Sequence, residues 1–245
     1  KGGCTAPIDL IEGRKGFCDA FAGGAEWDDS KITNNLGNPY FIVSPGVMVK
    51  KYPTCTFTHR CIDAIRQLVN SYQISADDVM EVECQTGTMA GDILTYDEPV
   101  TYLQGKFSLP FCMAIALLER KVGLCQVSDE KVNDPKTRQL MKRVRFCPQG
   151  EPAAQSDIVK VRLKDSREHS LGIDKPRGHP EIPLTDEELV SKYRDCAAVI
   201  LPKDEIARSL ELILNLEQLQ QTSKLMDIIA RIRHDVVGSK NNKKN

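Results

Sequence analysis

The segment from Val49 to His59, VKKYPTCTFTH, gathers side chains that could bind an anion. It holds two lysines, a cysteine, three threonines and a histidine, and apolar sequence flanks it on both sides. Lys50 and Lys51 end an extended stretch, so their side chains point to opposite faces, and one can face a cleft while the other faces water. A helix that begins near Thr58 adds free N–H groups. Cations, hydroxyls and an open helix N-terminus together suit a carboxylate or a phosphate.

Two interpretations of this segment stay open on pattern alone. A histidine in the first turn of a helix is disfavoured as imidazolium, so we expect His59 to be neutral. Lys-Lys-Tyr-Pro is also a common surface turn, and Thr58 can be simply a helix cap. Composition and spacing favour the surface turn, with the anion site as the alternative.

Two other positions could contribute to a cleft. Lys106 precedes the cap of an apolar helix, and Tyr96 lies in LTYDEP. A solvated lysine and a packing tyrosine are the simpler interpretations of both. The sequence has no GxGxxG, P-loop, GxSxG or HExxH motif that would point to a nucleotide, a nucleophilic serine or zinc.

Composition excludes several classes of partner. The chain has 245 residues, 41% hydrophobic and 27% charged, which is ordinary for one large or two small globular domains. A formal net charge of −1 gives no overall field for nucleic acid or acidic lipid. The longest apolar run, LPFCMAIALL, is too short to cross a bilayer and predicts a buried helix. We therefore expect neither a nucleic-acid nor a membrane partner.

The cysteines predict a reducing compartment. There are nine, an odd number, with no CxxC pair and no metal-ligand spacing to a histidine. This argues against a disulfide framework and against a metal site. We expect reduced cysteines and a cytoplasmic location. Lys1 stands where a methionine would begin a chain and no signal-peptide pattern is present, so we expect a processed protein or part of a longer one.

The central part of the chain predicts a mixed domain. An extended stretch around residues 40–53 precedes a helix, and DDVMEVECQT follows as a strand, giving a strand–helix–strand unit. Ser108 caps the apolar helix, Pro110 lies in its first turn, and Gly123 ends it. Pro135 opens another helix, and VRFCP, DIVKVRLKDS and EHSLGI are strands, with a hairpin turn at KDSRE. The helix after the first strand has one apolar face, formed by Cys61, Ile62, Ile65, Leu68, Val69 and Tyr72.

The ends of the chain are predicted to be helical. A Pro- and Gly-rich crossing, DKPRGHPEIPLT, leads to a capping box of Thr185 and Glu188 and a helix through Ala198. Further helices follow to about residue 232. We expect an α+β fold with boundaries at 1–40 (helical), 41–182 (α+β), 183–237 (helical) and 238–245 (disordered tail). The helical ends need something to pack on, and little in this chain supplies it.

Four phrases carry a resemblance to a known family: TAPIDLIEGRKGFCDAFAG, SPGVMVKKYPTCTFTHRCIDAI, YDEPVTYLQGKFSLPFCMAIALLE and PLTDEELVSKYRDCA. They resemble the MmgE/PrpD superfamily, which includes 2-methylcitrate dehydratase, cis-aconitate decarboxylase and iminodisuccinate epimerase. The resemblance runs from Thr5 to about Leu216. It implies the C-terminal half of such a protein: a small α+β lid domain flanked by helices of an all-helical domain whose larger part is missing from this chain.

The resemblance also assigns roles. The family's main active-site Asp and His residues, and one lysine, lie upstream of the point that matches Lys1. Lys50 matches the lysine of a K-[KR]-[YF]-P phrase that lines the decarboxylase site, so it is the expected catalytic and substrate-binding residue. Cys55 stands where the decarboxylases carry a histidine, which argues against decarboxylation. The histidine of the family's TH phrase matches His59, and a lid tyrosine lies near Tyr96; with Lys106 these complete the expected substrate-binding set.

The implied activity is that of a cofactor-independent carbon–oxygen lyase. Such an enzyme removes a proton next to a carboxylate of a small di- or tricarboxylic acid, such as 2-methylcitrate, and expels hydroxide. We expect this chain to be incomplete alone, with the N-terminal helical half and a second copy in a homodimer as partners. No metal or organic cofactor is implied. The alternatives are an isomerase or epimerase, a decarboxylase, or a non-catalytic subunit that needs the other half.

Overall fold

The computed structural model describes residues 5, 7–23, 26–28 and 30–230, so the tail predicted for residues 238–245 lies outside the described residues. The chain divides into two units, residues 1–47 and 48–245. The helices are α1 (Phe17–Ala22), α2 (Ser30–Thr33), α3 (His59–Tyr72), α4 (Thr88–Ile93), α5 (Tyr102–Gly105), α6 (Leu109–Glu119), α7 (Asp129–Asn133), α8 (Pro135–Met141), α9 (Asp186–Ala197), α10 (Lys203–Leu214) and α11 (Ser223–Ile229). The strands are β1 (Val79–Thr86), β2 (Val144–Pro148), β3 (Asp157–Leu163) and β4 (Glu168–Ile173).

Among its described residues, the first unit has the short helices α1 and α2, a helical turn at residues 42–46 and little core of its own. Phe17 and Phe21 of α1 stack with ring centroids 4.4 Å apart, yet both side chains are exposed. Ile8, Leu36 and Phe41 are also exposed, the last at 83%. These large apolar side chains are therefore exposed to water instead of being packed in a core.

The second unit is built on a four-stranded mixed sheet. Its strand order is β2-β1-β3-β4, with β1 parallel to β2 and the other pairs antiparallel. The four strands predicted after α3 and the β3–β4 hairpin are confirmed, and the mixed composition agrees with the α+β prediction. Val79 and Val82 are both fully buried although they are an odd number of residues apart, because the register of β1 shifts between Val79 and Glu81.

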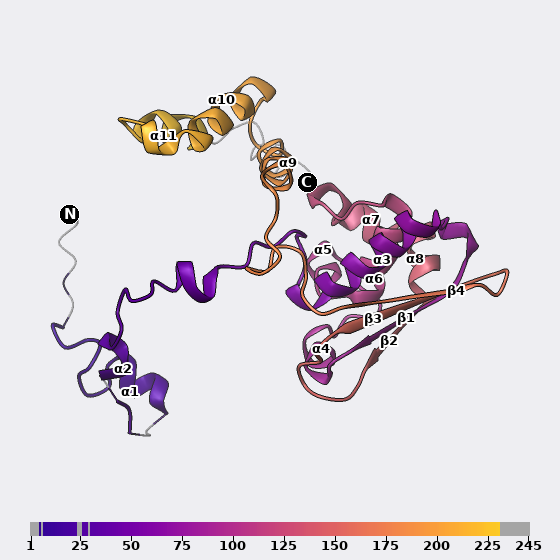
Figure 1. Cartoon of the computed structure of the whole chain (residues 1–245), viewed down its shortest axis with the longest axis horizontal. Helices are drawn as coiled ribbons and strands as arrows, with labels where there is room; N and C mark the ends of the chain where they lie inside the picture. Colours follow the sequence, from indigo (N-terminus) through magenta and orange to yellow (C-terminus); the bar gives the residue numbers. More distant parts are fainter. Residues whose placement is uncertain (1–4, 6, 24–25, 29, 231–245) are drawn as a thin grey trace, which may run out of the picture. The chain divides into compact units, whose positions relative to one another are not determined.

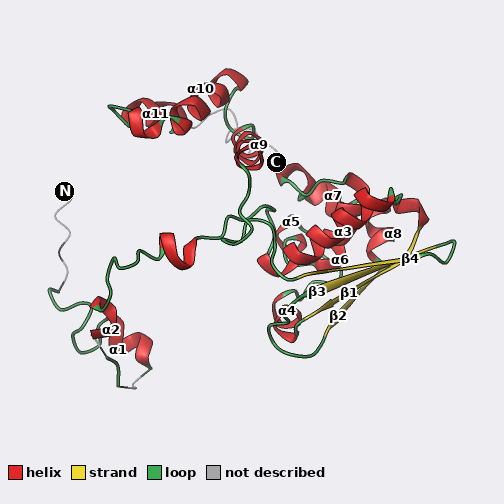
Figure 2. Ribbon diagram, viewed as in Figure 1, coloured by secondary structure: helices red, strands yellow, loops and turns green. Residues whose placement is uncertain are grey.

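Helices cover one face of the sheet and charges cover the other. Figures 1 and 2 show α3, α6 and α8 packed above the strands. On β3, Val159 and Val161 are fully buried while Lys160 and Arg162 alternate with them in solvent. Arg162 pairs across the strands with Glu81 at 2.6 Å. One face of the sheet is therefore buried and the other is exposed to solvent, as the alternating sequence of β3 predicts.

Two helices supply most of the core. The predicted apolar face of α3 is confirmed, with Cys61, Ile62 and Ile65 fully buried. The short helix α6 is buried from Leu109 to Leu117, and Ser108 caps it by accepting the Phe111 N–H at 3.2 Å. In the part of the chain that the structure describes, no helix combines the length and apolar character needed to cross a membrane.

Two local predictions are wrong. The extended stretch before α3 forms no strand: residues 42–46 make a helical turn, and Val49 then bonds through its N–H to the carbonyl of Gly178, at 2.9 Å, rather than to the sheet. The apolar helix does not run to Gly123. It ends at Glu119 because Arg120 adopts the left-handed conformation, with φ of 53°, and Gly123 instead precedes a separate 3₁₀ turn.

The crossing and the helix after it follow the prediction. Thr185 accepts the Glu188 N–H at 3.2 Å, and the Glu188 carboxylate accepts the Thr185 N–H at 3.0 Å, which is the expected capping box. No residue of α9 is buried, and α10 and α11 pack mainly on each other. Exposed apolar side chains remain on this part of the chain, at Val199, Ile200, Leu214, Leu216, Met226 and Ile229.

Candidate functional site

The turn before α3 folds around one backbone oxygen. The carbonyl of Thr54 lies 3.5 Å from the Lys50 Nζ and 3.3 Å from the His59 Nε2. The Thr58 hydroxyl donates to the Cys55 carbonyl at 2.8 Å, so it accepts from the Thr54 hydroxyl, 2.8 Å away. Residues 50–59 therefore form a tied turn at the N-terminus of α3.

His59 is an interior part of this turn. Its side chain is 1% exposed and packs edge-on against the Tyr52 ring, with centroids 5.2 Å apart. A carbonyl only accepts hydrogen bonds, so the Nε2 that faces Thr54 carries the hydrogen and Nδ1 is the unprotonated nitrogen. Burial, assisted by the Lys50 and Lys192 charges, lowers the pKa of His59 to about 4 against the opposing effects of the Thr54 carbonyl and Asp63. The imidazole is neutral, as predicted, and positions the turn.

This burial predicts an acid-sensitive fold. The unfolded chain binds a proton at His59 near pH 6.5, whereas the folded chain does so only near pH 4, so stability falls as the pH drops between these values. We expect His59 to cost about 3 kcal/mol of unfolding free energy between pH 7 and pH 4. Urea denaturation of wild type and His59→Gln across this range measures it. A difference between the two proteins that does not change with pH would contradict the assignment.

A backbone hydrogen bond joins Cys55 and Lys106. The Cys55 N–H donates to the Lys106 carbonyl at 2.9 Å, which fixes the turn to the loop between α5 and α6. The Lys106 ammonium lies over the Tyr102 ring, 5.0 Å from its centroid. Four of the five predicted residues, Lys50, Cys55, His59 and Lys106, thus belong to one region.

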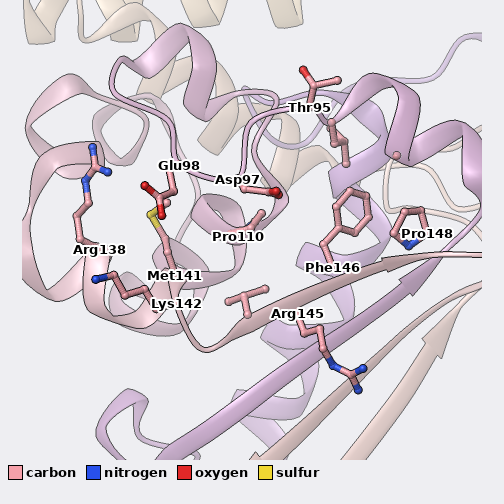
Figure 3. A pocket seen from close by; sticks show the side chains of 13 residues that line it. Thr95, Asp97, Glu98, Pro110, Arg138, Met141, Lys142, Arg145, Phe146 and Pro148 are labelled. Carbon is pink, nitrogen blue, oxygen red and sulfur yellow. The ribbon is translucent and has the colours of Figure 1, made fainter.

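Tyr96 lies elsewhere, in the loop after α4, with 40% of its side chain exposed. Its neighbours Asp97 and Glu98 line a cavity of about 880 Å³ beside the edge strand β2 (Figure 3). Arg138 and Lys142 of α8 line the same cavity, and Arg138 is fixed by the Pro99 carbonyl at 2.9 Å. None of the five predicted residues lines this cavity.

Lys51, rather than Lys50, faces a cavity. Lys50 is exposed, whereas Lys51 lines a cleft of about 530 Å³ and pairs with Glu188 of α9 at 2.7 Å. Burial opposes ionisation of Glu188, but hydrogen bonds from Lys51, the Thr185 N–H and Arg177 outweigh it and lower its pKa to about 2. The two lysines do point to different surroundings, as their alternation predicted.

Sequence reasoning missed a polar network beneath the turn. The Tyr52 hydroxyl donates to Asp63 at 2.6 Å and accepts from Arg66 at 3.0 Å. The other Asp63 oxygen accepts the Arg177 N–H at 2.8 Å. Burial and the Asp63 charge raise the pKa of Tyr52 above its usual value, so it stays a donor. This network ties the turn to α3 and to the Pro-rich crossing.

One signal for the network was present in the sequence. His59, Asp63 and Arg66 recur at helical spacing, so they share a face of α3, and an aspartate beside the apolar positions needs partners. Among the residues that the structure describes, no group of three or more His, Cys, Asp and Glu side chains could hold a metal ion.

Residues 52–218, which include most of the turn, the sheet and α9, match the MmgE/PrpD C-terminal domain. The chain belongs to the MmgE/PrpD family. That match covers well over half of this MmgE/PrpD chain, and it confirms the resemblance noted from the four phrases.

The relatives of this MmgE/PrpD chain include cis-aconitate decarboxylases. The protein from Aspergillus terreus is 21% identical over 233 residues, which cover 87% of this chain and 47% of the relative. The Mus musculus protein is 25% identical over 130 residues, covering 51% of this chain and 27% of the relative. The Homo sapiens protein is 25% identical over 135 residues, covering 54% and 28%. The chain spans about half the length, or less, of these curated relatives.

Proposed function

We propose that this chain supplies the lid side of the active site of a lyase that acts on a small di- or tricarboxylic acid. The reaction would remove a proton next to a carboxylate and expel hydroxide from a substrate such as 2-methylcitrate. The observation that carries the proposal is the tied turn before α3, which holds the Lys50 ammonium and the neutral His59 on one carbonyl, that of Thr54.

Lys50 is the residue that would meet the substrate. It is exposed, so its ammonium can leave the long 3.5 Å contact with Thr54 for a substrate carboxylate. A charge-assisted hydrogen bond from lysine to carboxylate binds the substrate and stabilises the negative charge that develops when the proton is lost. His59 is too deeply buried for such contact and would position the turn that carries Lys50.

The remaining groups would come from an N-terminal helical half. The resemblance places the family's Asp and His residues upstream of the segment that matches Lys1. The exposed apolar side chains of residues 1–47 and of α10 and α11 give such a half a surface to pack on. The proposed enzyme works in the cytoplasm as a homodimer, where its cysteines stay reduced.

Decarboxylation is the second candidate, because the relatives include cis-aconitate decarboxylases. The substitution at position 55 argues against it: Cys55 stands where the decarboxylases carry a histidine. Cys55 is half-buried and fixed by its N–H to Lys106, so it presents a small thiol in place of an imidazole. An isomerase or epimerase would use the same proton abstraction followed by return of the proton.

Product analysis tests the proposal. The chain together with its helical half is incubated with 2-methylcitrate, cis-aconitate and a chiral dicarboxylate, and products are identified by mass spectrometry and NMR. We expect loss of water and formation of a double bond. Release of CO₂ from cis-aconitate would instead support the decarboxylase, and exchange of the α-hydrogen with inversion would support the epimerase.

A further inference from the structure

The cleft on the Lys51 side of the turn is strongly cationic. It encloses about 530 Å³ between α9 and the α+β part of the chain (residues 41–182), which is called the lid below. Five cationic and two anionic side chains line it, a net charge of +3. The charged lining residues are Lys51, Arg66, Arg120, Lys121, Lys192, Glu188 and Asp195. An uncompensated charge of this size inside a cleft attracts an anionic ligand.

Both carboxylates of the cleft form ion pairs with basic side chains. Glu188 pairs with Lys51 at 2.7 Å and with Arg177, which lies outside the cleft, at 2.7 Å. Asp195 pairs with Lys121 at 2.7 Å. These pairs neutralise the two lysines and leave the other three cations of the cleft without a carboxylate in contact among the described residues.

The two arginines are nevertheless held in place. Arg66 donates to the Tyr52 hydroxyl at 3.0 Å and to the Arg120 carbonyl at 3.3 Å, and Arg120 donates to the Ile74 carbonyl at 3.2 Å. All three acceptors are neutral, so they orient the guanidinium groups without cancelling their charge. Asp63 is separated from Arg66 by Tyr52, and its oxygens receive Tyr52 and the Arg177 N–H.

The third cation that has no carboxylate in contact is supplied by α9. Lys192 lies on α9 together with Ser191, which also lines the cleft. A ligand that contacts Lys192 and the arginines at once would bridge α9 and the lid. The cleft volume is within the range of small-molecule sites, roughly 300–1,000 Å³.

We propose that this cleft binds a small polyanion with two or three carboxylate or phosphate groups, and that the ligand fastens α9 to the lid. Guanidinium groups bind either oxyanion through paired N–H donors, and the lysine adds a point charge. Because Lys51 and Tyr52 also line the cleft, the bound anion stiffens the segment that carries Lys50. The proposal does not depend on the lyase reaction.

Binding to the chain itself tests this inference. Citrate, pyrophosphate and acetate are titrated by isothermal calorimetry at constant ionic strength, and backbone amide exchange of α9 is followed by mass spectrometry. We expect saturable binding of one citrate or pyrophosphate per chain, much weaker binding of acetate, and slower exchange in α9. The preferred anion identifies carboxylate or phosphate as the natural group.

Matched variants make the test specific. Lys192→Gln and Arg120→Gln are each expected to weaken binding roughly tenfold. Arg120 supports the end of α6, so Lys192→Gln, whose side chain makes no recorded bond within the described residues, separates lost binding from lost folding. Lys142→Gln, on the cavity in Figure 3, should bind like wild type. Absence of saturable binding by both polyanions, or equal loss in all three variants, would overturn the proposal.

Discussion

Replacing Lys50 with alanine in the complete enzyme is expected to lower kcat/KM by roughly 10- to 150-fold. The physical reason is the loss of one charge-assisted hydrogen bond to a substrate carboxylate, which contributes about 1.5–3 kcal/mol to transition-state stabilisation. The fold should be unaffected, because among the described residues the Lys50 ammonium contacts only the Thr54 carbonyl, at 3.5 Å. Steady-state kinetics with the substrate found by product analysis gives the number.

Two further variants serve as controls for this measurement. Lys164→Ala removes an exposed lysine from the β3–β4 turn and should leave kcat/KM unchanged. Lys50→Arg keeps the charge and should recover part of the lost activity. If Lys50→Ala stays within about twofold of wild type, Lys50 is a surface lysine and the turn has no part in binding substrate.

Replacing Gly178 with alanine is expected to lower the free energy of unfolding by about 2–4 kcal/mol. Gly178 has a φ of 93°, a backbone conformation that residues other than glycine rarely adopt. An alanine Cβ there would lie 2.0 Å from the Val49 carbonyl oxygen, and the Val49 N–H donates to the Gly178 carbonyl at 2.9 Å. The variant must therefore push the two segments apart and break this hydrogen bond.

Gly178→Ala should also displace the turn at residues 50–59, because Val49 directly precedes Lys50. Gly172→Ala is the control: a Cβ there would make ordinary contact, 3.7 Å from the Ile158 side chain, and the strand conformation suits alanine. Urea denaturation of both variants measures the effect. Equal midpoints for the two variants would show that the approach of Gly178 to Val49 is not required for the fold.

Helices and strands that depend on interactions between residues near in sequence could be predicted. The apolar spacing from Cys61 to Tyr72 predicted α3, and the Thr185 and Glu188 pair predicted the start of α9. Both depend on contacts within a single helix, so a periodic pattern or a cap carries the information. The alternation on β3 likewise predicted which of its side chains are buried.

Features that depend on distant partners could not be predicted. Asp63 accepts the N–H of Arg177, 114 residues away, and Val49 bonds to Gly178 rather than to a strand. The end of α6 at Arg120 was missed because a left-handed arginine has no signature as clear as glycine. For the site, the alternation of Lys50 and Lys51 was predicted, but the cleft that Lys51 lines depends on α9.

The most direct measurement is the product analysis performed on two samples: this chain alone, and this chain with the N-terminal helical half. We expect no turnover by the chain alone and, in the mixture, loss of water from 2-methylcitrate or a related hydroxy acid without CO₂ release. Full turnover by the chain alone would contradict the shared site. CO₂ release from cis-aconitate by the mixture would contradict the assigned reaction.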